Sequence, residues 1–257
     1  MNQEILAARF DMTWVAVSFM VSVFGAHTAL WAAPGVAGMR KGEVNWVNAL
    51  LSGLALGGVG IWSMHFLGML AYDVPLAVGY RPLELVVSLV AAVIVSSLAL
   101  GYMAAQAFSW RRLLLAGPLA GIGVAVMHYL GMYGMRFGGY FDWAWDIVGL
   151  SVVIAMVAAS AALWLAFHTR QRSHRLAASV VMGAAVCTMH YTGMAAATVV
   201  CTTANRRAFM PDVLRAGDLG LAITVVAIGV AIIVTGDVFI QRANANKDGP
   251  LRNGAGA

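Results

Sequence analysis

One six-residue phrase recurs three times in the chain, each time inside an apolar stretch. It reads MHFLGM at 64–69, MHYLGM at 127–132 and MHYTGM at 189–194. Every copy places a histidine between two methionines, with a glycine before the second methionine. Imidazole binds copper, zinc or iron, and the soft, uncharged thioether of methionine favours Cu(I). Because no carboxylate lies within the phrase, it does not suit magnesium, calcium or a di-iron carboxylate centre.

The spacing within the phrase indicates which side chains act together. Residues four apart on a helix share a face, so each histidine lies beside the methionine that ends its phrase. The predicted metal ligands are these histidines and methionines: His65, His128, His190, Met69, Met132 and Met194. The methionine before each histidine lies about 100° around the helix, where it flanks the same site, serves a second one or packs. These three are Met64, Met127 and Met189.

The three motif histidines lie 63 and then 62 residues apart, and a fixed period indicates an internal repeat. Each period contains two apolar segments, so successive copies enter the membrane in the same direction and the motifs fall at one depth. Three helices around a pseudo-threefold axis would direct three imidazoles toward that axis. The spacing gives the equal depth, and the ring of histidines is an inference from it. The glycine one turn after each histidine is expected to let a neighbouring backbone approach closely.

The elements that must position these residues are membrane-spanning helices. Of the 257 residues, 61% are hydrophobic and only 11% are charged, against about a quarter in an average soluble domain. Apolar runs long enough to cross a hydrocarbon core of ~30 Å lie at 12–33, 47–70, 83–107, 113–135, 146–167, 176–198 and 218–240. Their many small residues favour packed helices over a membrane barrel. We therefore predict an all-α integral membrane protein with seven transmembrane helices.

The predicted organisation is one membrane domain, 1–240, built from three parallel two-helix repeats and one extra helix. The repeats of about 62 residues and the extra helix cover 12–72, 83–135, 146–198 and 218–240. The tail, 241–257, is polar and rich in Gly and Asn, so it is expected to be a short disordered segment.

The loop charges predict the orientation in the membrane. Alternate connections carry ten basic residues on one side and six on the other. By the positive-inside rule the first side is cytoplasmic, which places the N-terminus outside, the C-terminus in the cytoplasm and the three motifs near the outer face. Because the basic residues lie in these short loops, the net charge of +5 does not indicate a nucleic-acid partner.

Two other side chains within the predicted helices are interpreted differently from the motif. His27 lies toward the other end of the first helix, far in depth from the ring, and is interpreted as a core histidine with a hydrogen-bond partner. Cys187 shares a face with His190, but the other two copies have Trp62 and Ala125 at that offset. Cys187 therefore does not belong to a threefold ligand set.

At these residues the chain resembles the MHYT domain family, bacterial membrane sensor modules named for the phrase that stands intact at 189–192. The resemblance covers 12–240, and the first two copies of the phrase read MHFL and MHYL. It implies a metal site in the bacterial inner membrane, most often proposed to hold copper, formed by the motif histidines and methionines. It also implies sensing of a diatomic gas such as O2, CO or NO.

Many members of that family carry a cytoplasmic output domain, whereas only a short tail follows the last predicted helix here. The chain is therefore expected either to signal through a partner protein or to be the membrane part of a longer protein. We predict a sensor and not an enzyme, because no catalytic motif is found. Zinc or iron stays open as the metal. Copper transfer, a copper- or heme-dependent oxidoreductase and a scaffold without a cofactor stay open as functions.

Overall fold

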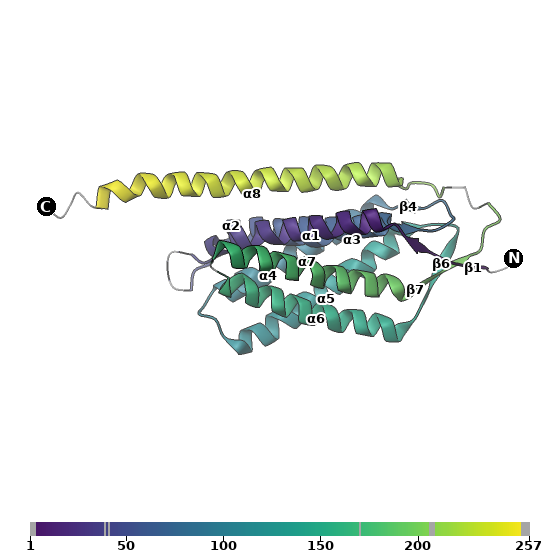
Figure 1. Ribbon diagram of the computed structural model, residues 1–257, viewed down its shortest axis with the longest axis horizontal. Coiled ribbons are helices and arrows are strands. Elements are labelled where there is room, and N and C mark those ends of the chain that lie inside the picture. Colours follow the sequence, from purple (N-terminus) through teal and green to yellow (C-terminus); the bar gives the residue numbers. More distant parts are fainter. Residues whose placement is uncertain (1–3, 39, 41, 170, 206–208, 253–257) are drawn as a thin grey trace.

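Seven helices long and apolar enough to span a membrane make up most of the computed structural model, which describes residues 4–38, 40, 42–169, 171–205 and 209–252 (Figure 1). Their bounds are α1 Met12–Ala32, with the 3-10 turn η1 Ala33–Val36; α2 Trp46–Gly53, η2 Leu54–Ser63 and α3 Met64–Leu70, which form one span; α4 Pro82–Ala104; α5 Trp110–Gly134; α6 Trp145–His168; α7 Arg172–Ala195; and α8 Ala216–Arg252. Each begins within four residues of its predicted start, so the seven predicted spans are confirmed.

Short strands at one end of the bundle show the repeat directly. In each repeat the strand before the first helix pairs, antiparallel, with the strand after the second helix. The pairs are β2 (Arg9–Phe10) with β3 (Tyr72–Asp73), β4 (Gly79–Tyr80) with β5 (Met135–Arg136), and β6 (Gly139–Trp143) with β7 (Ala197–Cys201). The first strand, β1 (Glu4–Leu6), adds to the free edge of β7. We call this end of the molecule the strand end; all three motifs lie close to it.

The six helices of the repeats form a closed ring. Around it α1 packs against the second span, the second span against α4, and then α4, α5, α6 and α7 follow in order until α7 returns to α1. The second span is the most buried of the seven, because α8 lies along its outer side (Figure 1). The ring therefore has approximate threefold symmetry, and α8 breaks it by covering one repeat.

A glycine in each motif helix allows the close packing between repeats. A Cβ at Gly57 would overlap the backbone of α4, and one at Gly121 would overlap the backbone of α6. A Cβ at Gly183 would press on Val23 of α1. Each repeat thus packs its second helix on the first helix of the next repeat, and small residues permit this where lipid surrounds the helices.

The second span is wound differently from the other two motif helices. Between α2 and α3, residues Leu54–Ser63 form a π-helix, in which each backbone N–H bonds five residues back. Two serines bond to backbone carbonyls there: Ser63 Oγ donates to the carbonyl of Gly58 at 2.9 Å, and Ser22 of α1 donates to that of Gly60 at 2.7 Å. Buried backbone groups require such partners.

The seventh helix differs from its prediction. It was expected to end at 240 and be followed by a disordered tail, but α8 continues to Arg252. Extending an existing helix adds one hydrogen bond for each residue ordered, whereas starting one is costly, so a polar segment can continue the helix. The remaining residues of the predicted tail, 253–257, lie outside the described residues.

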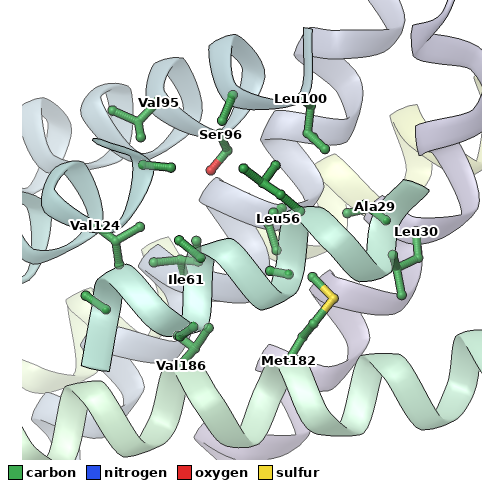
Figure 2. A pocket seen from close by; sticks show the side chains of 18 of the residues that line it. Ala29, Leu30, Leu56, Ile61, Val95, Ser96, Leu100, Val124, Met182 and Val186 are labelled. Carbon is green, nitrogen blue, oxygen red and sulfur yellow. The ribbon is translucent and has the colours of Figure 1, made fainter. Parts of the chain in front are cut away.

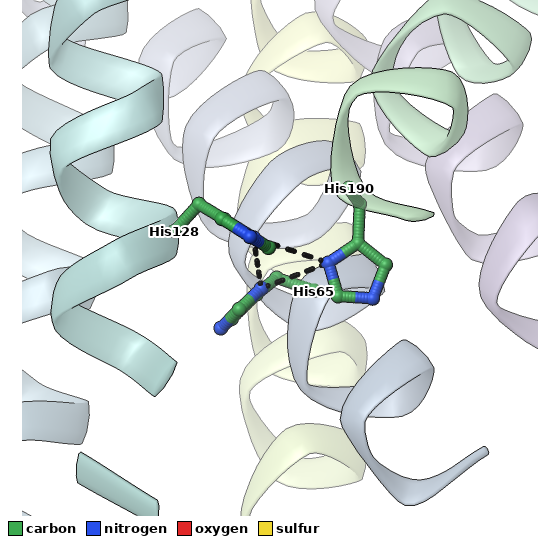
Figure 3. A group of neighbouring side chains, drawn as sticks. All are labelled: His65, His128 and His190. Carbon is green, nitrogen blue, oxygen red and sulfur yellow. Dashed lines mark hydrogen bonds between the residues drawn. The ribbon is translucent and has the colours of Figure 1, made fainter. Parts of the chain in front are cut away.

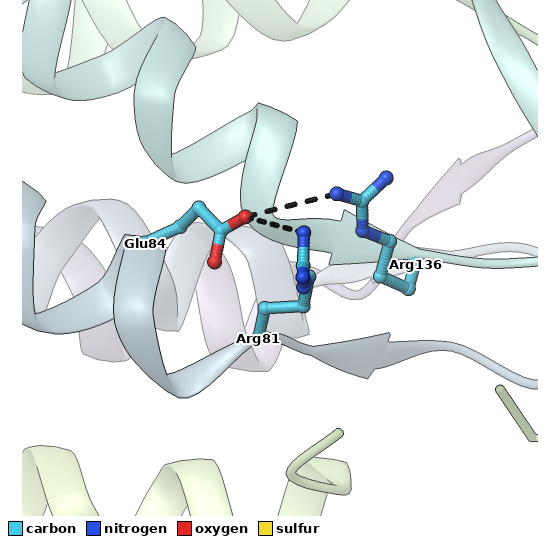
Figure 4. A network of polar contacts seen from close by, with 3 residues as sticks. All are labelled: Arg81, Glu84 and Arg136. Atoms are coloured by element: carbon cyan, nitrogen blue, oxygen red, sulfur yellow. Dashed lines mark hydrogen bonds and ion pairs between the residues drawn. The ribbon is translucent and has the colours of Figure 1, made fainter. Parts of the chain in front are cut away.

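A buried carboxylate ties the second repeat together at the strand end. Glu84, in the first turn of α4, lies with its Oε1 3.0 Å from Arg81 Nη1 and 3.7 Å from Arg136 Nη2 (Figure 4). Arg136 belongs to β5, the strand that follows α5, so this ion pair joins the start of one helix to the end of the next. A buried charge needs such partners to offset the loss of water.

Candidate metal centre

The three motif histidines meet on the axis of the ring. His65 reaches it from α3, His128 from α5 and His190 from α7 (Figure 3). Their Nδ1 atoms are 3.0 Å apart between His65 and His128, 3.1 Å between His65 and His190, and 3.2 Å between His128 and His190. All three side chains are at most 1% exposed. Among the described residues, this histidine triad is the group of His, Cys, Asp or Glu side chains close enough to share an ion.

The triangle of nitrogens has dimensions that suit a metal ion. With sides near 3.1 Å, its centre lies ~1.8 Å from each Nδ1, slightly inside the ~2.0–2.1 Å of a zinc–imidazole bond. Three neutral imidazoles that meet through Nδ1 cannot all satisfy one another by hydrogen bonds, because an Nδ1 that carries the proton cannot accept and one without it cannot donate. A cation at the centre would accept all three lone pairs. The residues present therefore fit a three-coordinate or four-coordinate metal.

The motif glycines receive the neighbouring histidine rings. A Cβ at Gly131 would overlap Nε2 of His65, and one at Gly193 would overlap Nε2 of His128. The third contact closes the circle, because a Cβ at Gly68 would overlap Nε2 of His190. The expectation that these glycines admit a neighbouring backbone is therefore corrected: they admit an imidazole side chain. Each repeat holds the ring of the preceding repeat in place.

The second nitrogen of each ring faces this glycine contact and not a carboxylate. None of the three Nε2 atoms makes a hydrogen bond of ordinary geometry to the described residues. Metal-bound histidines usually donate their other N–H to a carboxylate, a carbonyl or water, which strengthens the ligand. Here the orientation of the rings comes from packing against glycine.

The six motif methionines lie in the core around the triad. Met64, Met69, Met127, Met132, Met189 and Met194 are each at most 2% exposed. Five of them, all except Met64, belong to the main hydrophobic core. Their burial is that of packed core side chains, and their role as ligands stays a prediction.

The two other side chains considered from the sequence lie where they were expected. His27 of α1 is outside the triad, and its Nδ1 lies 3.2 Å from Ser179 Oγ of α7. It is a partly buried histidine with the expected hydrogen-bond partner. Cys187 is a buried free cysteine and likewise does not belong to the triad.

In the second and third repeats, the residue after the histidine makes a contact that was not predicted from the sequence. Tyr129 lies with its hydroxyl 2.6 Å from Ser151 Oγ of α6, and Tyr191 with its hydroxyl 2.8 Å from Ser18 Oγ of α1. Both serines are the seventh residue of the first helix of a repeat, and the same position in α4 is Ser88. This recurrence is visible in the sequence and could have revealed the contact.

In the first repeat the equivalent contact uses a different donor. Phe66 follows His65 and has no hydroxyl, so Ser88 Oγ accepts instead from Trp62 Nε1 at 3.1 Å. The three buried serines thus join each motif helix to the next repeat, two through tyrosine and one through tryptophan. These contacts fix the rotation of the motif helices, and with it the direction of the histidines.

Two strand residues cover the strand end of the triad helices. Tyr80 of β4 donates from its hydroxyl to the carbonyl of Met69 at 3.4 Å, and Tyr72 of β3 donates to that of Ala197 at 3.2 Å. Burial raises the pKa of both phenols above its usual value, because the charged form would lose its solvation. Both side chains therefore stay neutral hydrogen-bond donors.

Comparison with known proteins identifies the family to which the repeat belongs. A family model described as "Bacterial signalling protein N terminal repeat", MHYT, matches residues 58–116 and 121–179. The chain is 38% identical over 244 residues to the bifunctional diguanylate cyclase/cyclic di-GMP phosphodiesterase MucR of Pseudomonas aeruginosa, which covers 90% of this chain and 34% of that protein.

Two further relatives are signalling proteins. The cyclic di-GMP phosphodiesterase NbdA of Pseudomonas aeruginosa is 34% identical over 195 residues, 73% of this chain and 24% of NbdA. The signalling protein YkoW of Bacillus subtilis is 31% identical over 203 residues, 74% of this chain and 24% of YkoW. The chain thus spans about a third or less of the length of these relatives, and no solved structure matches it. The two matched repeats, the thrice-repeated phrase and this similarity show that the chain belongs to the MHYT family of bacterial signalling proteins.

Proposed function

We propose that the chain is a membrane sensor module whose histidine triad holds one copper ion and responds there to a diatomic gas. The observation that carries the proposal is the convergence of three buried Nδ1 atoms within 3.0–3.2 Å of one another. An ionisable group inside a membrane is costly, so three at one point need a function that offsets the cost.

The chemistry of the donors favours copper in its reduced state. The triad is neutral and contains no carboxylate, so a divalent ion there would keep its full charge in a buried apolar site. Cu(I) carries one charge and accepts imidazole and thioether ligands. When bound, copper supplies a coordination position for O2, CO or NO. Zinc and iron bind imidazole too, and measurement of the bound metal distinguishes them.

The packing provides a means for the triad to move the helices. Each histidine ring lies against the glycine of the next repeat, so a change in the separation of the three nitrogens shifts α3, α5 and α7 relative to one another. The second span packs against α8, which continues beyond the ring to Arg252 (Figure 1). Signalling requires two arrangements of such an element, with the ligand favouring one of them.

The proposed output lies at the far end of α8. The loop charges favour a cytoplasmic location for this end and an outer location for the strand end. Because relatives are named as a cyclic di-GMP cyclase or phosphodiesterase, we infer that the signal reaches an enzyme of that class, as a partner or as a further segment of the same protein. The proposal assigns no catalytic step to the membrane domain itself.

Metal analysis tests the site. The chain is purified from membranes without added metal and its metals are measured by mass spectrometry, beside a variant with His65, His128 and His190 changed to alanine. About one copper per chain in the wild type and none in the variant are expected. The matched control is His27→Ala, which lies outside the triad and should keep the copper. Copper retained by the triple variant, or no uptake by the wild type after anaerobic Cu(I) addition, would overturn the proposal.

Gas titration is then carried out on the copper-loaded protein. CO or NO is added without oxygen while X-ray absorption at the copper edge is recorded. A change in the spectrum of the wild type supports gas sensing. An unchanged spectrum with copper present would leave a metal site without this function, and zinc or iron in place of copper would overturn the copper chemistry.

A further inference from the structure

A cavity lies inside the ring of helices, next to the triad. Its volume is about 60 Å3, and all six helices of the repeats line it while α8 does not (Figure 2). Nine of the twenty lining residues are alanine, whose short side chains leave this space open. Ser96 contributes a hydroxyl, and the other lining residues are apolar.

The cavity lies one helical turn from the histidines. In α5 and α7, cavity-lining residues and the motif histidine follow one another at intervals of four, which places them on one face. These residues are Ala120, Val124 and His128 in α5, and Met182, Val186 and His190 in α7. Met189, beside His190 in the chain, also lines the cavity. The axis of the triad therefore continues into the cavity.

The π-helix brings the second span into the same register. Its lining residues, Leu56 and Ile61, are five apart, and His65 follows Ile61 by four. Five residues in a regular α-helix would turn Ile61 ~140° away from Leu56, but in a π-helix residues five apart are joined by a backbone hydrogen bond and lie close to one face. The unusual winding of η2 thus serves the cavity and the triad together.

The lining determines which molecules the cavity can hold. Cavities with apolar walls stay dry and accept apolar guests such as xenon. The volume of about 60 Å3 is several times the ~10–15 Å3 that one water-sized sphere needs. It is well below the ~300–1,000 Å3 of sites for larger organic ligands. With no charged side chain in the lining, an ion has no partner there.

We propose that this cavity is a binding site for a small apolar gas molecule, held within one helical turn of the histidine triad. Apolar gases are more soluble in the hydrocarbon around the helices than in water, so the membrane supplies the occupant. The use of the cavity in sensing rests on the proposed function, whereas its occupation by gas does not. Gas stored there would reach the triad from within the protein and not from the aqueous side.

Xenon binding to the metal-free chain tests the proposal. Methionine methyl groups are labelled with 13C, and their NMR signals are followed as xenon pressure rises. Met182 and Met189 line the cavity, whereas Met12 and Met20 are 70% and 60% exposed and report xenon dissolved in the surrounding detergent. We expect saturable shifts at Met182 and Met189 and only small, linear shifts at the two exposed methionines. Linear shifts at all four would overturn the proposal.

Two neighbouring alanines of α6 provide a matched pair of variants. Ala162 lines the cavity, whereas Ala161 is exposed outside it, so Ala162→Leu fills the space and Ala161→Leu does not. The saturable shift should be lost only in Ala162→Leu; its persistence there would overturn the assignment to this cavity. Should that variant fail to fold, the wild-type titration still decides. Because no metal is present, a saturable shift in a chain that never binds copper would keep this inference and reject only the proposed function.

Discussion

The first motif helix differs from the other two in its winding, although each of the three helices places its motif histidine in the triad. In α5 and α7 the histidine lies seven positions after the packing glycine, as in Gly121 to His128. In the second span it lies eight positions after, from Gly57 to His65. The extra residue falls within the π-helix, which absorbs it without rotating the rest of the span. A symmetric site therefore does not require symmetric helices.

The repeat with the extra residue is also the one that α8 covers. Among the three motif helices, the second span makes extensive contact with α8, mainly through η2. Both its donor to Ser88 and the residue after its histidine differ from those of the other repeats. Two repeats thus maintain the geometry of the ring, and the third connects it to the helix that leaves the bundle. This division explains why the covered repeat departs from the common pattern.

Deletion of the extra residue should produce the largest effect. Removing Gly58 would restore the spacing of the other two motif helices and leave Leu56, Ile61 and His65 on one face. The chain before and after the deletion keeps its orientation, but the π-helix must rewind as an α-helix. Ser63 Oγ then loses the carbonyl of Gly58, to which it donates at 2.9 Å, and the carbonyl of Gly60 moves away from Ser22 Oγ, which donates to it at 2.7 Å. A buried hydroxyl left without a partner costs about 1–3 kcal/mol, so we expect copper binding to remain while the free energy of unfolding falls by about 2–6 kcal/mol.

Thermal unfolding in detergent and copper content measure these two effects separately. The control is Gly58→Ala, because a Cβ there meets only Leu89 at 3.6 Å and Val93 at 3.8 Å, which are ordinary contacts. This variant should behave like the wild type. A deletion variant as stable as the wild type would show that the two serine contacts of the π-helix do not stabilise the fold.

Alanine at the motif glycines should have the next largest effect, and an equal one in all three repeats. Each added methyl group collides with a histidine ring of the preceding repeat. Overpacking of this kind costs about 1–3 kcal/mol, and displacement of one ring should abolish copper binding. Copper content and unfolding of Gly68→Ala, Gly131→Ala and Gly193→Ala test the expectation.

The matched control for these variants lies in α6. A Cβ at Gly149 meets nothing within 4 Å, so Gly149→Ala should stabilise the helix by up to about 1 kcal/mol. A milder effect of Gly68→Ala alone would contradict the threefold equivalence of the site and would mean that the π-wound repeat is more adaptable there. Copper retained in all three variants would contradict the role of the glycines.

The sequence predicts the features of this molecule that depend on hydropathy and period. Seven spans follow from apolar length, and the depth shared by His65, His128 and His190 follows from the repeat. The direction of the three rings depends on helix rotation, which the Tyr–Ser and Trp–Ser contacts set, so spacing alone leaves it undetermined. The glycine contacts were misassigned to backbone for the same reason.

Other features leave only a weak pattern in the sequence. Strands of two residues, such as Gly79–Tyr80, are too short for an alternating pattern. The π-helix appears only when Gly57 and Gly121 are aligned as packing glycines, which requires knowing what they contact. The cavity leaves no pattern in the sequence, because alanines are also common where membrane helices pack closely without a cavity. The helical tail of α8 was missed because its polar composition favours disorder when the segment is considered apart from the helix predicted before it.

Removal of the tyrosine hydroxyls should have the smallest effect. It tests a contact that the second and third repeats have and that the first repeat, which α8 covers, lacks. Tyr129→Phe and Tyr191→Phe each lose one buried hydrogen bond, worth about 0.5–1.5 kcal/mol. The partner Ser151 keeps its bond to the carbonyl of Val148 at 2.8 Å, so no buried hydroxyl is left without a partner. Copper binding should remain. Thermal unfolding and metal content of each variant check both expectations.

Addition of a hydroxyl at the equivalent position of the repeat that α8 covers, by Phe66→Tyr, should not stabilise the fold. Phe66 is fully buried, and the tip of its ring would lie 3.1 Å from a Cβ at Gly131, so Phe66→Tyr places a hydroxyl where there is no room. Ser88 already accepts from Trp62. We therefore expect Phe66→Tyr to destabilise the fold by about 1–3 kcal/mol, more than either loss of a tyrosine hydroxyl. If Phe66→Tyr unfolds at the same temperature as the wild type, the first repeat can accommodate a tyrosine as the other two do. The difference between the repeats would then come from α8 alone.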